Sequence, residues 1–211
     1  MITRLSAIIT SLLLSCAAAS ANEHVLSYEG GEGPGKGKHV VLLSGDEEYR
    51  SEECMPMLGK LLAERHGFKT TVLFSIGADG TIDPTAGPSV EGIEALDSAD
   101  LVIMLLRFRT WPDDKMKHFD AYLKSGKPII ALRTSTHAFN HPAGSTYAKY
   151  GWKAPKDSGW EGGFGRAVLG ETWGTHWGKH KKEACLAVIE ESQKEHPILR
   201  GIEQMFADSD V

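Results

Sequence analysis

The stretch that decides the fold class is Lys127-Pro-Ile-Ile-Ala-Leu-Arg-Thr-Ser-Thr-His-Ala-Phe139. Its apolar run, residues 129–132, is continuous rather than alternating. Such a run is typical of a strand buried on both faces within a parallel sheet. Polar side chains begin directly after it, at Arg133, and continue to His137. Because ligands bind outside the carboxyl ends of such strands, the sequence predicts a functional site at this turn.

Strand and helix patterns alternate before this stretch. Three further apolar runs of strand length lie at residues 39–44, 69–74 and 101–106. Helical spacing of apolar residues predicts one helix that is capped by Ser51 and ends at Gly67, and another that opens at Pro112 and ends at Gly126. This alternation predicts an α/β fold with a mostly parallel sheet and right-handed crossovers.

The N-terminal residues 1–21 have the parts of a secretory signal peptide. Arg4 is a short positive region, residues 5–14 are mostly apolar, and Ala19-Ser20-Ala21 is a small-x-small cleavage site. We therefore expect a periplasmic or secreted protein. Lipoprotein processing at Cys16, which would attach a lipid anchor, is the alternative. No apolar segment long enough to span a bilayer follows.

Residues 22–37 are rich in Gly and Glu, which predicts a flexible lead-in to one domain at residues 38–211. The spacing from Gly30 to Lys36 imitates a phosphate-binding loop. However, Gly37 stands where that loop has Ser or Thr, and the segment precedes the first predicted strand instead of following one. Phosphate binding is therefore not predicted here.

The overall charge and the cysteines bear on nucleic-acid binding and on disulfide formation. The net charge is −5 with no basic block, which argues against binding to a nucleic-acid backbone. After removal of the signal peptide two cysteines remain, Cys54 and Cys185. In an oxidising compartment they would be able to pair, and two buried free thiols are the alternative.

Polar side chains follow three of the predicted strands, and a parallel sheet would bring them to one rim. They are Ser44, Asp46, Glu47, Tyr49, Arg109, Arg133, Ser135 and His137. His137 and Glu47 are the acid–base candidates, and the two arginines suit a carbonyl, an oxyanion or a sugar hydroxyl. The alternative is a solvated turn with a structural ion-pair network.

Residues 151–178 combine eight glycines with four of the five tryptophans and lack periodicity. Such a segment predicts a binding loop, in which Trp173 would stack on a sugar ring and His176 would contact the ligand. A small separate core is the alternative. The i, i+4 spacing of His176 and His180 also fits a metal site completed by His137, His141 or Glu171, but it lacks the HExxH signature. We predict neither a metal nor a cofactor.

Taken together, the motifs resemble the ThuA-like (trehalose-utilisation) domains of the class I glutamine amidotransferase-like superfamily. The motifs are Ser44-Gly-Asp-Glu-Glu-Tyr-Arg50, the run 101–106 before Arg107, the run 127–137, Gly162-Gly-Phe-Gly165 and His196-Pro-Ile198. The resemblance covers residues 38–211. It implies a flavodoxin-like three-layer sandwich and an association with disaccharide or keto-sugar metabolism in bacteria that export such proteins.

The resemblance also implies that Arg133 occupies the elbow position at which true amidotransferases carry a nucleophilic Cys. Arginine is not a nucleophile, so glutamine hydrolysis is not expected. The expected function is that of an exported sugar-processing enzyme without a Cys nucleophile. A non-catalytic glycan- or protein-binding module and a metal-dependent hydrolase using His176 and His180 are the alternatives. Because ThuA-like domains usually continue past the region seen here as Asp208-Ser-Asp210, we expect a chain that is incomplete at its C-terminus.

Overall fold

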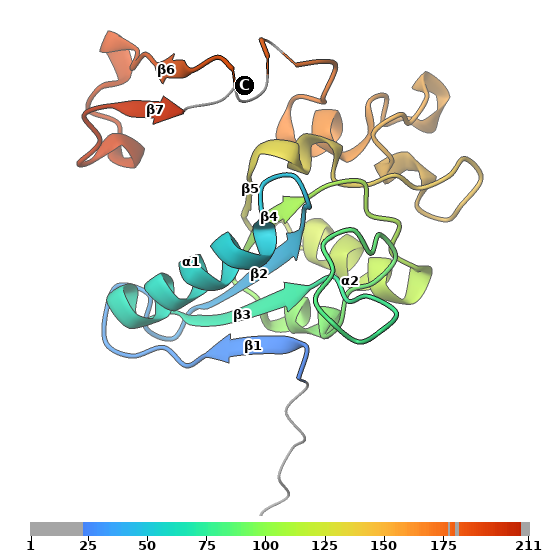
Figure 1. Ribbon diagram of the computed structural model, residues 1–211, viewed down its shortest axis with the longest axis horizontal. Coiled ribbons are helices and arrows are strands. Elements are labelled where there is room, and N and C mark those ends of the chain that lie inside the picture. Colours follow the sequence, from blue (N-terminus) through green and yellow to red (C-terminus); the bar gives the residue numbers. More distant parts are fainter. Residues whose placement is uncertain (1–22, 177, 180–181, 208–211) are drawn as a thin grey trace, which may run out of the picture. The chain divides into compact units, whose positions relative to one another are not determined.

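The computed structural model describes residues 23–176, 178–179 and 182–207, and the chain divides into two compact units, Met1–Leu132 and Arg133–Val211 (Figure 1). The predicted signal peptide, the Cys16 anchor, His180 and residues 208–211 lie outside the described residues, so the expectations that rest on them stay predictions. No helix within the described residues is long and apolar enough to cross a membrane.

The first unit is an α/β structure built on a five-stranded mixed sheet. Its strands are β1 (Val25–Tyr28), β2 (His39–Gly45), β3 (Lys69–Phe74), β4 (Leu101–Leu106) and β5 (Ile129–Ala131), in the order β1-β3-β2-β4-β5. Strands β2 to β5 pair in parallel, and β1 is antiparallel to β3. The helices are α1 (Ser51–His66) and α2 (Asp113–Lys124), with a 3-10 turn at Ile93–Ser98. The predicted α/β architecture with a mostly parallel sheet is confirmed.

Both faces of the central strands are buried. On β2, Val40 and Leu42 pack in one cluster with Met55 of α1, while the alternate residues Val41 and Leu43 are also almost fully buried. Successive side chains of a strand point to opposite faces, so a continuous apolar run requires cover on both. Helix α1 covers the face of Val40 and Leu42 through buried residues at every fourth position, Met55, Gly59 and Ala63.

Helix α2 buries Met116, Phe119 and Tyr122. The hydroxyl of Tyr122 donates a 2.7 Å hydrogen bond to the carbonyl of Pro128. Burial raises the pKa of Tyr122 to about 12. The loop before β5 is therefore held by a tyrosine that the apolar pattern alone did not identify.

The raised pKa of Tyr122 predicts an alkaline loss of stability. A group whose pKa is raised in the folded state stabilises fully below its unfolded pKa of about 10, and this contribution disappears as the pH rises through the folded value. We expect the unfolding free energy to fall more steeply between pH 10 and 12 in the wild type than in Tyr122→Phe. Urea unfolding across this range measures the difference, and parallel curves would contradict the prediction.

Strand β5 corrects the expectation of a strand buried on both faces. It is the last strand in the sheet order, and Ile130 is 47% exposed. It is also one residue shorter than predicted, because it ends at Ala131 and the predicted run extended to residue 132. An apolar run of this length gives no information on whether the strand lies at the edge of a sheet, which is why the prediction was wrong.

Residues 22–37 are not the flexible lead-in that composition predicted. Strand β1 lies within them and pairs with β3, from Val25 opposite Leu73 to Tyr28 opposite Thr70. The glycines that follow β1 then pack closely on the loop between α1 and β3. A Cβ on Gly30 would lie 2.2 Å from the carbonyl oxygen of Gly67, and the amide of Gly35 donates to the carbonyl of His66.

This close packing predicts opposite results at two neighbouring glycines. Gly30→Ala places a methyl group against main-chain atoms, so we expect it to lower the unfolding free energy by about 2 kcal/mol. Gly31→Ala is the matched control, because nothing lies within 4 Å of its Cβ position, and its effect should stay within about 0.5 kcal/mol. Equal unfolding midpoints in urea for the two variants would show that the segment does not pack as described.

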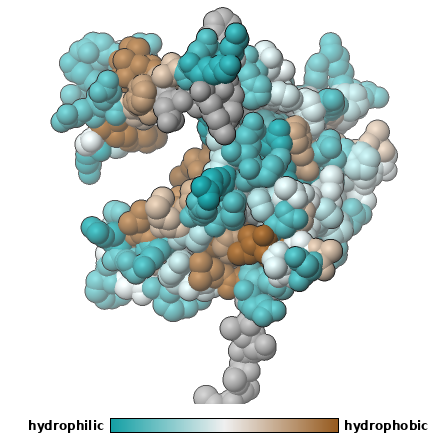
Figure 2. Space-filling view, viewed as in Figure 1, coloured by the Kyte–Doolittle hydropathy of each residue, from teal (hydrophilic) through white to brown (hydrophobic). Residues whose placement is uncertain are grey.

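The second unit consists of short elements, and part of it packs around an aromatic core. Its elements are η2 (Arg133–His137), η3 (Ala148–Tyr150), η4 (Lys156–Ser158), η5 (Gly165–Leu169), β6 (Cys185–Ala187), η6 (Glu191–Gln193), η7 (Pro197–Leu199) and β7 (Met205–Ala207). Phe139 and Phe164 are fully buried, with ring centroids 5.5 Å apart. The antiparallel pair of β6 and β7 instead exposes apolar side chains, which form a brown area on its surface in Figure 2. They include Leu186 and Phe206, and Val188, directly after β6, is exposed as well.

Candidate functional site

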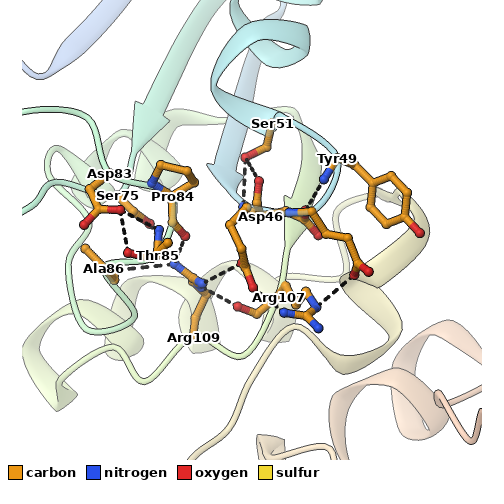
Figure 3. A network of polar contacts seen from close by, with 12 residues as sticks. Asp46, Tyr49, Ser51, Ser75, Asp83, Pro84, Thr85, Ala86, Arg107 and Arg109 are labelled. Atoms are coloured by element: carbon orange, nitrogen blue, oxygen red, sulfur yellow. Dashed lines mark hydrogen bonds and ion pairs between the residues drawn. The ribbon is translucent and has the colours of Figure 1, made fainter. Parts of the chain in front are cut away.

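The turn after β2 is held from within by Asp46 and Ser51 (Figure 3), and Ser44 of β2 bonds to Ser51. The Asp46 carboxylate is fully buried and accepts the amide N–H of Glu48 and of Tyr49, each at 2.7 Å. The Ser51 hydroxyl accepts the amide of Asp46 at 2.8 Å and donates to its carbonyl at 2.9 Å, and Ser44 donates to Ser51. Ser44 and Asp46, predicted as ligand contacts, therefore shape the turn.

The same bonds correct the predicted start of helix α1. Ser51 is the first residue of the helix instead of its cap, and Arg50 holds the capping position with a left-handed φ of 52° and no side-chain cap. Because the Ser51 hydroxyl bonds to Asp46, it is not available to the helix N-terminus. Serine is a favoured capping residue, which is why the sequence predicted a cap here, but its hydroxyl bonds to the main chain of Asp46 instead.

Arg109 is turned into the first unit and is only 3% exposed. Its guanidinium donates to the carbonyls of Arg107 at 2.6 Å and Pro84 at 2.9 Å, and to the hydroxyl of Ser75 at 3.1 Å (Figure 3). Burial lowers the pKa of Arg109, and the nearby Glu47 opposes this shift. The arginine thereby fastens the loop after β3 to the end of β4.

The outward-facing charges of this region belong to Glu47, Glu48 and Arg107. Arg107 forms ion pairs with both glutamates, and the second Glu47 oxygen lies 3.7 Å from Nη2 of Arg109. Tyr49 packs partly against the cluster of α1 and the sheet. Glu47, an acid–base candidate in the sequence, is thus engaged by two arginines, as the structural-network alternative described.

Arg133 stands at a strained strand-to-helix turn. It lies two residues after the end of β5, has a left-handed φ of 41° and opens η2, while its side chain is exposed. Ser135 and His137 of the same turn are buried. Left-handed backbone is costly for residues other than glycine and gathers at functional turns. The described residues hold two more such positions, Arg50 directly before α1 and Phe108 two residues after β4.

Within the second unit His137 lies in a group of rings that we call the Trp173 group, made of His137, Trp152, Trp173 and His176. The ring centroid of Trp173 is 5.0 Å from that of His137, 5.3 Å from Trp152 and 5.8 Å from His176. Such rings offer faces for stacking on a sugar, with imidazole nitrogens beside them for its hydroxyls. Trp152 was not among the site residues predicted from the sequence, although its place in the Gly/Trp segment was the available signal.

The Gly162–Gly165 motif explains how η2 is positioned in this unit. A Cβ on Gly165 would lie 2.0 Å from the carbonyl oxygen of Thr136, so only glycine allows η5 to approach η2 this closely. A Cβ on Gly163 would likewise lie 2.1 Å from the carbonyl of Gly151. The motif is thus a packing device directly beside His137, and it contributes no reacting group of its own.

Metal and thiol chemistry gain no support from the residues described. No three His, Cys, Asp or Glu side chains in that part of the chain form a group that could hold a metal ion. Since His180 lies outside it, the His176–His180 alternative stays a prediction. Cys54 and Cys185 are not joined in a disulfide, and burial raises the pKa of Cys54, which disfavours a reactive thiolate there.

The predicted site residues therefore fall into two sets, one in each unit. The first unit brings together Ser44, Asp46, Glu47, Tyr49 and Arg109, and the second holds Arg133, Ser135, His137, Trp173 and His176. The expectation that both sets share one rim stays a prediction. No family model, curated protein or solved structure matches the chain. The ThuA-like resemblance thus rests on the motifs quoted above.

Proposed function

We propose that this chain is an exported ThuA-like domain that binds a disaccharide or keto-sugar and takes part in its metabolism, without glutamine amidotransferase activity. The proposal includes a flavodoxin-like three-layer arrangement of the first unit, a finer statement than the α/β sheet described above. Its main support is the backbone of Arg133. A strained residue between a strand and a helical turn, with an exposed side chain, is the geometry of a nucleophile elbow.

The elbow geometry matters because it is costly to keep. An elbow presents one side chain above a strand end and leaves the following amides free to bond to an oxyanion. Here the presented side chain is a guanidinium, which binds a carbonyl or hydroxyl oxygen but does not form a covalent intermediate. We infer that Arg133 polarises a sugar carbonyl or orients a hydroxyl, and that His137 supplies or accepts the proton.

The Trp173 group supplies the sugar-binding surface in this proposal. The ring of Trp173 lies against the buried His137, so a sugar stacked on Trp173 would lie beside the imidazole. We expect soluble disaccharides and their 3-keto forms to raise the melting temperature of the wild-type protein, and Trp173→Ala or His137→Ala to abolish that shift. Trp160→Ala is the matched control, because Trp160 is a partly exposed tryptophan of the same unit that contacts Tyr150 instead.

Arg133 allows a test that separates function from folding. Arg133→Gly removes the cost of the left-handed conformation, about 1–2 kcal/mol. The greater freedom of glycine in the unfolded chain offsets about 0.5–1 kcal/mol of this gain in stability. We therefore expect unchanged or slightly higher stability together with a lost response to sugars. Arg50→Gly relieves a similar φ of 52° in the first unit and should keep that response. A normal sugar response in Arg133→Gly would refute the role proposed for the guanidinium.

A non-catalytic glycan-binding module is the second candidate, and one observation favours it. Both oxygens of Glu47 are engaged by arginines, which leaves this acid–base candidate poorly placed to exchange a proton with a ligand. The same titrations distinguish the two functions when products are also followed by chromatography. Conversion of a bound sugar supports the enzyme, whereas saturable binding with no product over a day supports the module.

A further inference from the structure

A groove of about 480 Å³ lies in the first unit between the glycine-rich segment after β1 and the start of β3. Its lining includes His39 and Lys69, which are the first residues of β2 and β3. The groove therefore lies at the amino ends of these parallel strands, at the opposite edge of the sheet from the polar turns after their carboxyl ends. Nothing in the proposed sugar chemistry uses it.

Three lysines line this groove against two glutamates. They are Lys36, Lys38 and Lys69, with Glu29 and Glu32 beside them. Each lysine has a carboxylate partner, and Nζ of Lys69 lies 3.7 Å from Glu29 while Nζ of Lys38 lies 3.3 Å from Asp100. All of these side chains are more than two-fifths exposed. Exposed pairs of this kind are weak, so a doubly charged anion would compete well for the lysines.

The backbone of the groove also suits an oxyanion. With β1 in place, the glycine-rich segment follows a strand, which removes one of the two sequence objections to phosphate binding. Open space surrounds the Cβ positions of Gly31 and Gly37, and Gly37 has a left-handed φ of 77°. Bare main chain in such turns forms anion-binding concavities. Because a strand follows and Gly37 replaces Ser or Thr, this is not the nucleotide-binding loop itself.

We propose that this groove binds a small molecule through a phosphate monoester group, with Lys36 and Lys69 pairing with its charge and the glycine main chain approaching its oxygens. The ring of His39 is fixed by hydrogen bonds to Ser98 at 3.0 Å and Thr71 at 2.9 Å, so one wall of the groove is already in place before a ligand arrives. The site is independent of the sugar-binding function proposed for the second unit.

The test uses the full chain and inorganic phosphate as the probe, at constant ionic strength maintained with chloride. We expect saturable amide shifts at Gly31 and Gly37 in NMR titrations, and apparent affinity about tenfold weaker or more in Lys36→Gln/Lys69→Gln. Lys60→Gln/Lys117→Gln removes the same charge from exposed positions on α1 and α2 outside the groove, and should bind phosphate as the wild type does.

Two outcomes of the phosphate titration would overturn the proposal. One is the absence of phosphate-specific shifts at these glycines, and the other is an equal loss of affinity in both double variants, which would indicate general charge screening. Parallel titrations with sulfate and with a sugar phosphate show which kind of anion the groove prefers. Tighter binding of the sugar phosphate than of phosphate supports a monoester ligand, whereas identical affinities for all three anions would also overturn the proposal, because the groove would then bind simple anions only.

Discussion

Arg109→Ala is expected to lower the unfolding free energy of the protein by about 3 kcal/mol, the larger of the two effects expected in the first unit. The side chain is 3% exposed and its donors reach the carbonyls of Arg107 and Pro84 and the hydroxyl of Ser75. Truncation leaves these acceptors buried without their donor, and unpaired buried polar groups cost more than the bonds they replace contribute.

Lysine should not restore the stability that Arg109 provides. The guanidinium donates through two different nitrogens, Nε to Arg107 and Nη1 to Ser75 and Pro84. A single ammonium group does not reproduce this planar arrangement of donors. We therefore expect Arg109→Lys to recover less than half of the lost free energy in urea unfolding.

The control for Arg109 is Arg65→Ala, which removes an exposed arginine from the last turn of α1 and should change stability by less than about 0.5 kcal/mol. Limited proteolysis gives a second readout, because release of the loop after β3 should create new cleavage near Pro84. If Arg109→Ala unfolds at the same urea concentration as Arg65→Ala, the arginine faces solvent or a ligand, as the sequence alone predicted.

Arg109 also shows where prediction from sequence stopped. The apolar runs of β2 and β4 were long enough to predict buried strands, and their polar ends were correctly placed after them. The direction of a polar side chain at such an end depends on the local backbone conformation, which the residue types do not reveal. Phe108, between Arg107 and Arg109, has a left-handed φ of 54°, which is rare for a bulky residue and not predictable from its type.

Strands β1 and β5 show the complementary limit. Strand β1, Val25–Tyr28, is short and lies next to a run of glycines. The Gly-rich composition therefore led to the prediction of a flexible segment, although β1 contains apolar residues. Its place is decided by β3, which pairs with it from another part of the chain. For β5 the run itself was visible, but exposure of Ile130 is a property of sheet order, which only long-range pairing determines.

Gly165→Ala is the corresponding change in the second unit, and we expect it to lower the unfolding free energy by about 3 kcal/mol. The reason is steric, since the φ of Gly165 is not left-handed. The added methyl would lie 2.0 Å from the carbonyl oxygen of Thr136 and 2.8 Å from that of Glu171. Both are main-chain atoms, so no side-chain rotation relieves the contact, and η5 must move away from η2.

That movement should also reach the candidate sugar site, because Thr136 precedes His137 and its hydroxyl lies 3.2 Å from Nδ1 of that histidine. We expect the variant to lose the thermal response to sugars and to show altered tryptophan fluorescence even below its melting temperature. Gly174→Ala is the matched control, as nothing lies within 4 Å of its Cβ position and it stands next to Trp173. Loss of the sugar response in both variants would point to the loop around Trp173 itself, whereas loss in Gly165→Ala alone indicates that the close approach of η5 to η2 holds His137 in place.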